Sequence, residues 1–173
     1  MNRTREIVTA GLFIALGYVL PMIFHVFSMG GPAFLPMHLP ILLAGLVLSP
    51  QSALLVGVIT PILSSLLTGM PTLYPMLPIM IFELATYGFI IAICYRKYEL
   101  GYYKSLFIAM FAGRIVAGLV VTFLALGFGL PMSPIPYILG AIVTGLPGIV
   151  IQLLAVPALA KLLDVIGFQT YSV

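Results

Sequence analysis

Charged side chains are scarce in this chain. Lys, Arg, Asp and Glu make up 6% of its 173 residues, whereas a soluble domain carries about a quarter. So few charges could not cover the protein with a hydrated surface, which excludes an ordinary soluble fold. The net charge of +3 is too small to indicate nucleic-acid binding. Tryptophan is absent, and Cys94 is the only cysteine, which excludes an intrachain disulfide and a cysteine-based metal site.

Signature sequences of enzymes are missing as well. The chain has no Walker A sequence for ATP hydrolysis, and it has neither a G-x-S-x-G nor an H-E-x-x-H motif. Ser64 and Ser65 have no evident histidine base, and neither histidine has a carboxylate nearby in the sequence. We therefore expect no catalytic site, no cofactor and no metal centre.

Long apolar runs are present instead. The chain is 62% hydrophobic, with a mean hydropathy of +1.26. Residues 7–27 carry no charge, and residues 105–151 carry only Arg114. Both runs exceed the roughly 18 residues that indicate a membrane span. The first is too long for the core of a signal peptide, and no small-x-small cleavage site follows it, so we expect a retained helix.

Glycine and proline divide the apolar sequence into six predicted spans. Their approximate bounds are 6–27, 36–48, 51–69, 75–95, 102–127 and 136–161. The basic residues fall before the first span, between the fourth and fifth, and after the sixth: Arg3, Arg5, Arg96, Lys97, Lys104 and Lys161. Positive charge stays on the cytoplasmic side, so an even number of crossings must separate these groups. The sequence thus predicts one all-α integral membrane domain over residues 1–173, with six transmembrane helices and both termini cytoplasmic.

The loops predicted on the opposite side contain no Lys, Arg, Asp or Glu. They cover residues 28–35, 69–74 and 128–135 and consist of Gly, Pro, Met, Ser, Thr and apolar residues. Segments of this composition can fold back over a cavity instead of projecting into water.

Glu83 and Arg114 each lie near the middle of a predicted span. A charge at the bilayer centre costs at least about 2.5–3.5 kcal/mol, so it normally faces a partner or a wet cavity. One hypothesis is a structural ion pair between the fourth and fifth spans, and the other is binding of a polar ligand. The two hypotheses are compatible if Glu83 orients Arg114 and the guanidinium of Arg114 binds a ligand carboxylate.

Five further side chains are candidates for ligand contact because they lie near the uncharged loops. They are His38, Thr144, Thr122, Tyr74 and Tyr137. Each has a plainer interpretation: an interfacial histidine, threonines that bond their own helix backbone, and tyrosines of an interfacial belt.

Small residues mark one face of the first span. Gly11 and Ala15 form a small-xxx-small pair, which permits close helix approach. The contact could be internal packing or a partner subunit.

Two stretches carry a family resemblance. Residues 34–50, FLPMHLPILLAGLVLSP, and residues 67–71, LTGMP, followed by IFELATYG at 81–88, resemble the S components of energy-coupling factor (ECF) vitamin transporters. They are most similar to the pantothenate, folate and hydroxymethylpyrimidine branch. The resemblance covers essentially the whole chain, with Ser49-Pro50 standing where Gly-Pro is expected.

This resemblance implies a substrate-binding subunit in a prokaryotic plasma membrane. An S component binds its vitamin but needs a membrane scaffold subunit with two ATPase subunits to deliver it. Gly11 and Ala15 match the docking motif, with Gly replacing the first Ala, and the vitamin is expected under the first outer loop. We expect pantothenate, because Arg114 is the single deep cation. Hydroxymethylpyrimidine, a pyridoxine-like compound, folate and a queuosine precursor are the alternatives.

Rival functions are a channel or self-sufficient secondary carrier, a membrane enzyme and a structural assembly subunit. One acid and one base within the spans make a poor ion pathway. Ligand binding by the purified protein, with uptake only beside a scaffold and ATPases, separates these possibilities.

Overall fold

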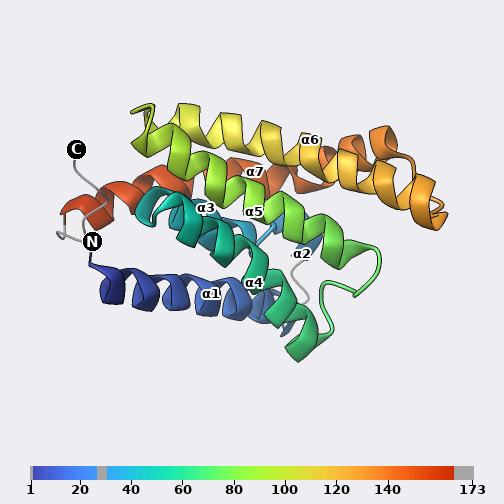
Figure 1. Cartoon of the computed structure of the whole chain (residues 1–173), viewed down its shortest axis with the longest axis horizontal. Helices are drawn as coiled ribbons and strands as arrows, with labels where there is room; N and C mark the ends of the chain where they lie inside the picture. Colours follow the sequence, from blue (N-terminus) through green and yellow to red (C-terminus); the bar gives the residue numbers. More distant parts are fainter. Residues whose placement is uncertain (1, 27–30, 166–173) are drawn as a thin grey trace.

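The computed structural model describes residues 2–26 and 31–165, and within these ranges the chain forms helices and no strand. Five helices are long and apolar enough to cross a membrane. They are α1 (Arg3–Val26), α4 (Pro50–Thr68), α5 (Met76–Arg96), α6 (Tyr102–Phe128) and α7 (Pro134–Val165). They lie lengthwise beside one another, and α1 begins where α7 ends (Figure 1). The predicted all-α class is confirmed for these ranges, with each long helix starting and ending within four residues of a predicted span.

The ends of the long helices follow from local sequence. The Ser49 side chain accepts a hydrogen bond from the Ser52 amide and so caps α4, and Pro50 occupies the first helical position. Gly69 and Gly129 end α4 and α6 with φ of 75° and 66°. These are left-handed conformations that glycine adopts without steric cost.

The second predicted span, over 36–48, corresponds to the ten-residue helix α3 (His38–Val47). A four-residue helix α2 (Gly31–Phe34) and a turn precede it. Ten residues rise only about 15 Å, half the hydrocarbon thickness. Leu35 has φ of 50°, and Pro36 supplies no amide donor, so one continuous helix cannot form here.

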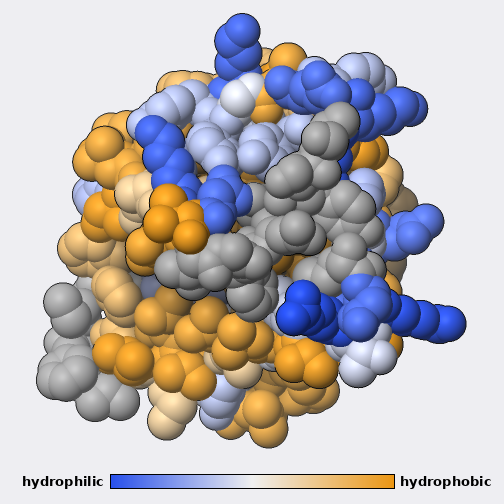
Figure 2. All heavy atoms as spheres, turned by 90° about the vertical axis from the view of Figure 1, so that its left-hand side faces the viewer, coloured by the Kyte–Doolittle hydropathy of each residue, from blue (hydrophilic) through white to orange (hydrophobic). Residues whose placement is uncertain are grey.

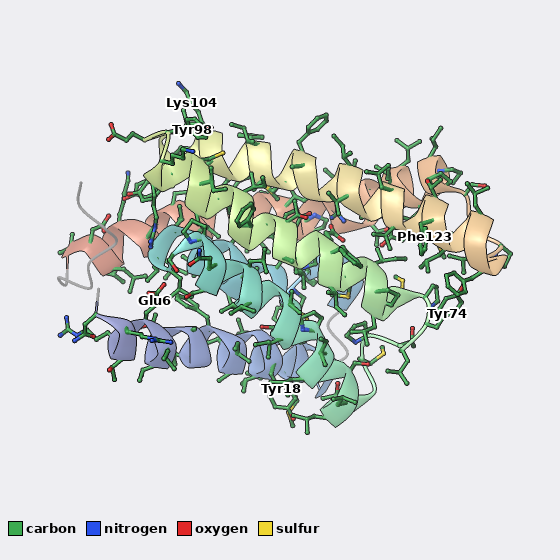
Figure 3. The ribbon with its side chains drawn as sticks, viewed as in Figure 1. Glu6, Tyr18, Tyr74, Tyr98, Lys104 and Phe123 are labelled. Atoms are coloured by element: carbon green, nitrogen blue, oxygen red, sulfur yellow. The ribbon has the colours of Figure 1, made fainter. Side chains whose placement is uncertain are left out.

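The end of α3 nevertheless returns the chain to the end where it began. The Ser49 amide, just after α3, donates a 2.9 Å hydrogen bond to Glu6 Oε1 near the start of α1 (Figure 3). The short buried helix α3, together with α2 and the turn between them, therefore replaces a full transmembrane helix. The later helices, α4 to α7, follow in the predicted order.

The helix α3 lies in the centre of the bundle. It packs against α1, α4, α5 and α7, and nine of its ten residues are buried. Beside it, α4 and α5 approach with their backbones in contact. A Cβ on Gly57 would lie 2.5 Å from the Leu84 carbonyl oxygen, and one on Gly88 would lie 2.5 Å from the Ala53 carbonyl oxygen. Only glycine fits these two positions without a shift of the helices.

All Lys, Arg, Asp and Glu residues except Glu83 and Arg114 gather at the end of the bundle where α1 begins, hereafter the charged end. Figure 2 views this end, where hydrophilic side chains collect over an otherwise apolar body. Tyr102 donates a 2.6 Å hydrogen bond to Asp164 there, which joins the start of α6 to the last turns of α7. At the opposite, far end, the loops at 69–75 and 129–133 carry no charge. Residues 28–30 of the first uncharged loop lie outside the described ranges.

Candidate ligand-binding site

A cavity of about 540 Å³ lies between the start of α3, the loop after α4, and helices α5, α6 and α7. Its size falls within the range typical of small-molecule sites. Most of its wall is apolar, with methionines and prolines predominating. Six polar side chains reach it: His38, Thr72, Glu83, Arg114, Tyr137 and Thr144.

Glu83 and Arg114 form an ion pair in the wall of this cavity. Arg114 NH1 lies 2.5 Å from Glu83 Oε1, and the two side chains are 12% and 3% exposed. Tyr87, one turn after Glu83, donates a 2.8 Å hydrogen bond to the same oxygen. The other guanidinium nitrogens of Arg114 have no hydrogen-bond partner among the described residues. Glu83 thus binds one guanidinium nitrogen of Arg114, and the remaining guanidinium N–H groups can donate to a ligand.

A glycine on α6 makes this arrangement possible. A Cβ at Gly113 would lie 2.0 Å from the Tyr87 ring, so the ring can lie against α6 only because that side chain is absent. The sequence analysis identified neither Tyr87 nor Gly113. Tyr87 lies four residues after Glu83 on α5, and this spacing was the available signal for it.

His38 joins the pair from the first turn of α3. Its Nε2 lies 3.9 Å from Glu83 Oε1, and its ring meets the Tyr87 ring at a centroid distance of 5.6 Å. No carboxylate lies near His38 in the sequence, but the packing of α3 on α5 brings Glu83 to it. His38 is 4% exposed, and neither ring nitrogen has a hydrogen-bond partner among the described residues.

The remaining candidates divide into two groups. Thr144 and Tyr137 line the cavity. Thr122 does not line it, because its hydroxyl donates a 2.8 Å hydrogen bond to the Gly118 carbonyl one turn earlier on α6. Tyr74 is also outside the cavity wall, 51% exposed at the far end (Figure 3). Thr122 and Tyr74 thus lie outside the cavity wall.

The cavity also contains residues that the sequence analysis missed. Thr72 and Met70 come from the loop after α4, and Met76 and Met80 from the first turns of α5. Methionine side chains are flexible and polarisable, so they can adapt to the apolar part of a ligand. The signal was the uncharged composition of residues 69–74. Within the described residues, no three His, Cys, Asp or Glu side chains are grouped to hold a metal ion.

The family model for the substrate-specific component of ECF transporters matches residues 5–160. The chain belongs to this family. It is therefore a multi-pass membrane component of a transporter. The family is not an enzyme family, and its members work with an ECF scaffold, ATPases and a small-molecule substrate. No curated protein and no solved structure matches the chain.

In this S component the segment before α3 rests on α7. A Cβ on Gly148 would lie 2.6 Å from the Phe34 carbonyl oxygen, and Gln152 donates a 3.4 Å hydrogen bond to the Leu35 carbonyl. Leu35 in turn lines the cavity. Gln152 thus binds the chain between α2 and α3. The glycine and the amide together position this wall of the cavity.

The small residues of α1 lie on two different faces of the helix. Thr9 and Gly17 are buried against the bundle, whereas Gly11 and Ala15 are exposed. A Cβ on Gly11 would meet no atom within 4 Å. Internal packing of Gly11 and Ala15, one of the two interpretations of this pair, is therefore absent, and their face is open to a partner.

Proposed function

We propose that this S component binds a small carboxylate-bearing vitamin or precursor in the cavity, with pantothenate as the first candidate. The proposal rests on the position of the Arg114 guanidinium in the cavity wall. Its guanidinium is held by Glu83 at one nitrogen, and its other donors are left for the cavity. A guanidinium presents paired N–H groups that match a carboxylate. Apart from the Glu83–Arg114 pair, the described charges lie at the charged end.

The rest of the cavity suits the rest of pantothenate. The vitamin has two hydroxyls and an amide, for which Thr72, Thr144, Tyr137 and His38 supply donors and acceptors. Its dimethyl group suits the methionine- and proline-rich wall. Folate has two carboxylates and a large ring system, which fit less well in about 540 Å³ beside a single arginine.

The first test is direct. The protein is purified in mild detergent, the co-purified small molecules are identified by mass spectrometry, and binding is measured by calorimetry. We expect pantothenate to bind more tightly than pantothenol, in which a primary alcohol replaces the carboxylate. Equal affinities, or hydroxymethylpyrimidine or pyridoxine as the bound molecule, would show that Arg114 does not select a carboxylate.

We further propose that Gly11 and Ala15 dock on the scaffold subunit, which carries two ATPase subunits. Small residues on an exposed helix face allow a second helix to approach closely. The charged end would then face the cytoplasm of a prokaryotic cell, consistent with its basic residues.

The docking proposal predicts a separation of two activities. Gly11→Leu or Ala15→Leu should abolish uptake by cells that co-express the scaffold and ATPases, while ligand binding by the isolated variant is unchanged. Leu66→Phe is the control, because Leu66 is 70% exposed on a different helix, α4. Loss of ligand binding in the α1 variants would contradict a docking role. Uptake without the ATPases would instead favour a secondary carrier.

A further inference from the structure

The charges around the cavity balance before a ligand enters. Glu83 and Arg114 neutralise each other at 2.5 Å. A ligand carboxylate would add one negative charge to a site that is largely removed from water. An uncompensated charge there is unfavourable, so entry of an anion requires a further positive charge.

His38 is the group placed to supply that charge. It lines the cavity, is 4% exposed, and neither of its ring nitrogens has a partner among the described residues. A buried polar group without a partner is costly, and both nitrogens of a doubly protonated imidazole are donors. Histidine is also the side chain that most readily changes charge between pH 5 and 8.

The helices packed against α3 present few other titratable groups to His38. Glu83 and Tyr87 approach from α5, at 3.9 Å and at a ring-centroid distance of 5.6 Å. Arg114 and Tyr137 line the same cavity from α6 and α7. The helix α4 contains no titratable side chain. The charged groups of α1 lie at the charged end, and its Tyr18 does not line the cavity.

We propose that His38 takes up one proton when a carboxylate ligand binds, so that the site accepts an anion without gaining net charge. This rests on the carboxylate site proposed above and adds the linked protonation. The proton comes from water and adds to the free nitrogen of the neutral imidazole. In the resulting imidazolium, the Nε2–H group faces Glu83 and the Nδ1–H group is free to donate within the site.

The sign of the pH dependence follows. Because binding consumes a proton, lowering the pH favours the complex. As the pH is lowered, the dissociation constant for pantothenate should decrease by up to tenfold per pH unit until the free protein already carries the proton. The affinity for pantothenol should not change, because a neutral ligand needs no compensating charge.

Calorimetry in two buffers counts the proton. At pH 7.5 the heat of binding is compared in phosphate and in Tris, whose ionisation enthalpies differ, so the difference in heat reports the protons exchanged. We expect close to one proton taken up with pantothenate and none with pantothenol. In His38→Gln, whose amide can hydrogen-bond but cannot become charged, pantothenate should bind more weakly, without proton uptake and without pH dependence. Thr122→Ala, which lies outside the cavity, is the control, in which proton uptake should persist.

The outcomes separate the two proposals. Pantothenate binding to the wild-type protein without proton uptake would overturn the role of His38 and leave the carboxylate site standing. Proton uptake that persists in His38→Gln would assign the proton to another group and also overturn it. Absence of pantothenate binding would refute the substrate proposal, and the protonation proposal with it. Because the wild-type comparison of two ligands needs no variant, poor folding of His38→Gln would not leave the proposal untested.

Discussion

Replacement of Arg114 by Gln tests whether this residue grips the ligand or only neutralises Glu83. The substitution removes a guanidinium nitrogen 2.5 Å from Glu83 Oε1 and leaves Tyr87, at 2.8 Å, as the remaining hydrogen-bond donor to Glu83. Removing one partner of a buried ion pair typically costs about 3–5 kcal/mol. We therefore expect a clear decrease in the melting temperature of the purified variant, whatever the ligand is.

The effect on binding has a separate origin. If Arg114 also bonds the ligand carboxylate, Arg114→Gln removes a charge-assisted hydrogen bond worth about 1.5–3 kcal/mol. Since each 1.4 kcal/mol corresponds to a factor of about ten, the dissociation constant for pantothenate should increase between about 10-fold and about 150-fold. Arg114→Lys should lose less, because it keeps the charge but not the paired donors.

The double variant Glu83→Gln with Arg114→Gln distinguishes the two roles. It has no orphaned buried charge, so its melting temperature should recover toward that of the wild-type protein. Its affinity for pantothenate should stay as low as that of Arg114→Gln, because the ligand carboxylate still lacks its partner. Calorimetry and a thermal melt on the same preparations give both values. Recovery of near-normal affinity in the double variant would refute direct ligand contact by Arg114.

Three further predictions follow from the same geometry. Thr144→Ala should weaken ligand binding by up to about tenfold, the equivalent of one hydrogen bond, whereas Thr122→Ala should leave it unchanged; equal effects in calorimetry would contradict their assigned positions. Gly148→Ala should destabilise the protein by about 1–3 kcal/mol through overpacking, and Gly127→Ala, whose Cβ would meet no atom within 4 Å, should not, as judged by thermal melts. In a variant without the native cysteine, Asn2→Cys should react with a membrane-impermeant thiol reagent only after the cells are opened, and labelling of intact cells would reverse the proposed orientation.

The long helices could be predicted because each is a run of apolar residues bounded by Gly, Pro or charge. Hydropathy does not distinguish a residue that faces lipid from one that faces protein, so the run at 36–48 was predicted as a full crossing. The structure makes this stretch a buried half-helix, α3, preceded by the turn at Leu35 and Pro36. Composition alone contains no signal for that difference.

Within the site, residue type was more predictable than position. Glu83 and Arg114 stood out because a charge within a span needs a partner, and the ion pair was among the stated hypotheses. Which threonine faces the cavity depends on how each helix is rotated about its own axis. These helices are only weakly amphipathic, so their sequences do not reveal that rotation. The proximity of His38 to Glu83 depends on contacts between α3 and α5, far apart along the chain, and no local pattern records such a contact.

The central location of α3 separates the ligand site from the lipid environment. Because nine of its ten residues contact protein instead of lipid, exchanging one detergent or lipid for another leaves the surroundings of His38 nearly unchanged. Ligand affinity should then depend little on bilayer thickness or headgroup composition. The face of α1 that carries Gly11 and Ala15 is exposed to the surrounding lipid, so any partner must displace lipid there. The lipid composition of the cell would therefore influence how often this subunit engages a partner more than how tightly it holds its ligand.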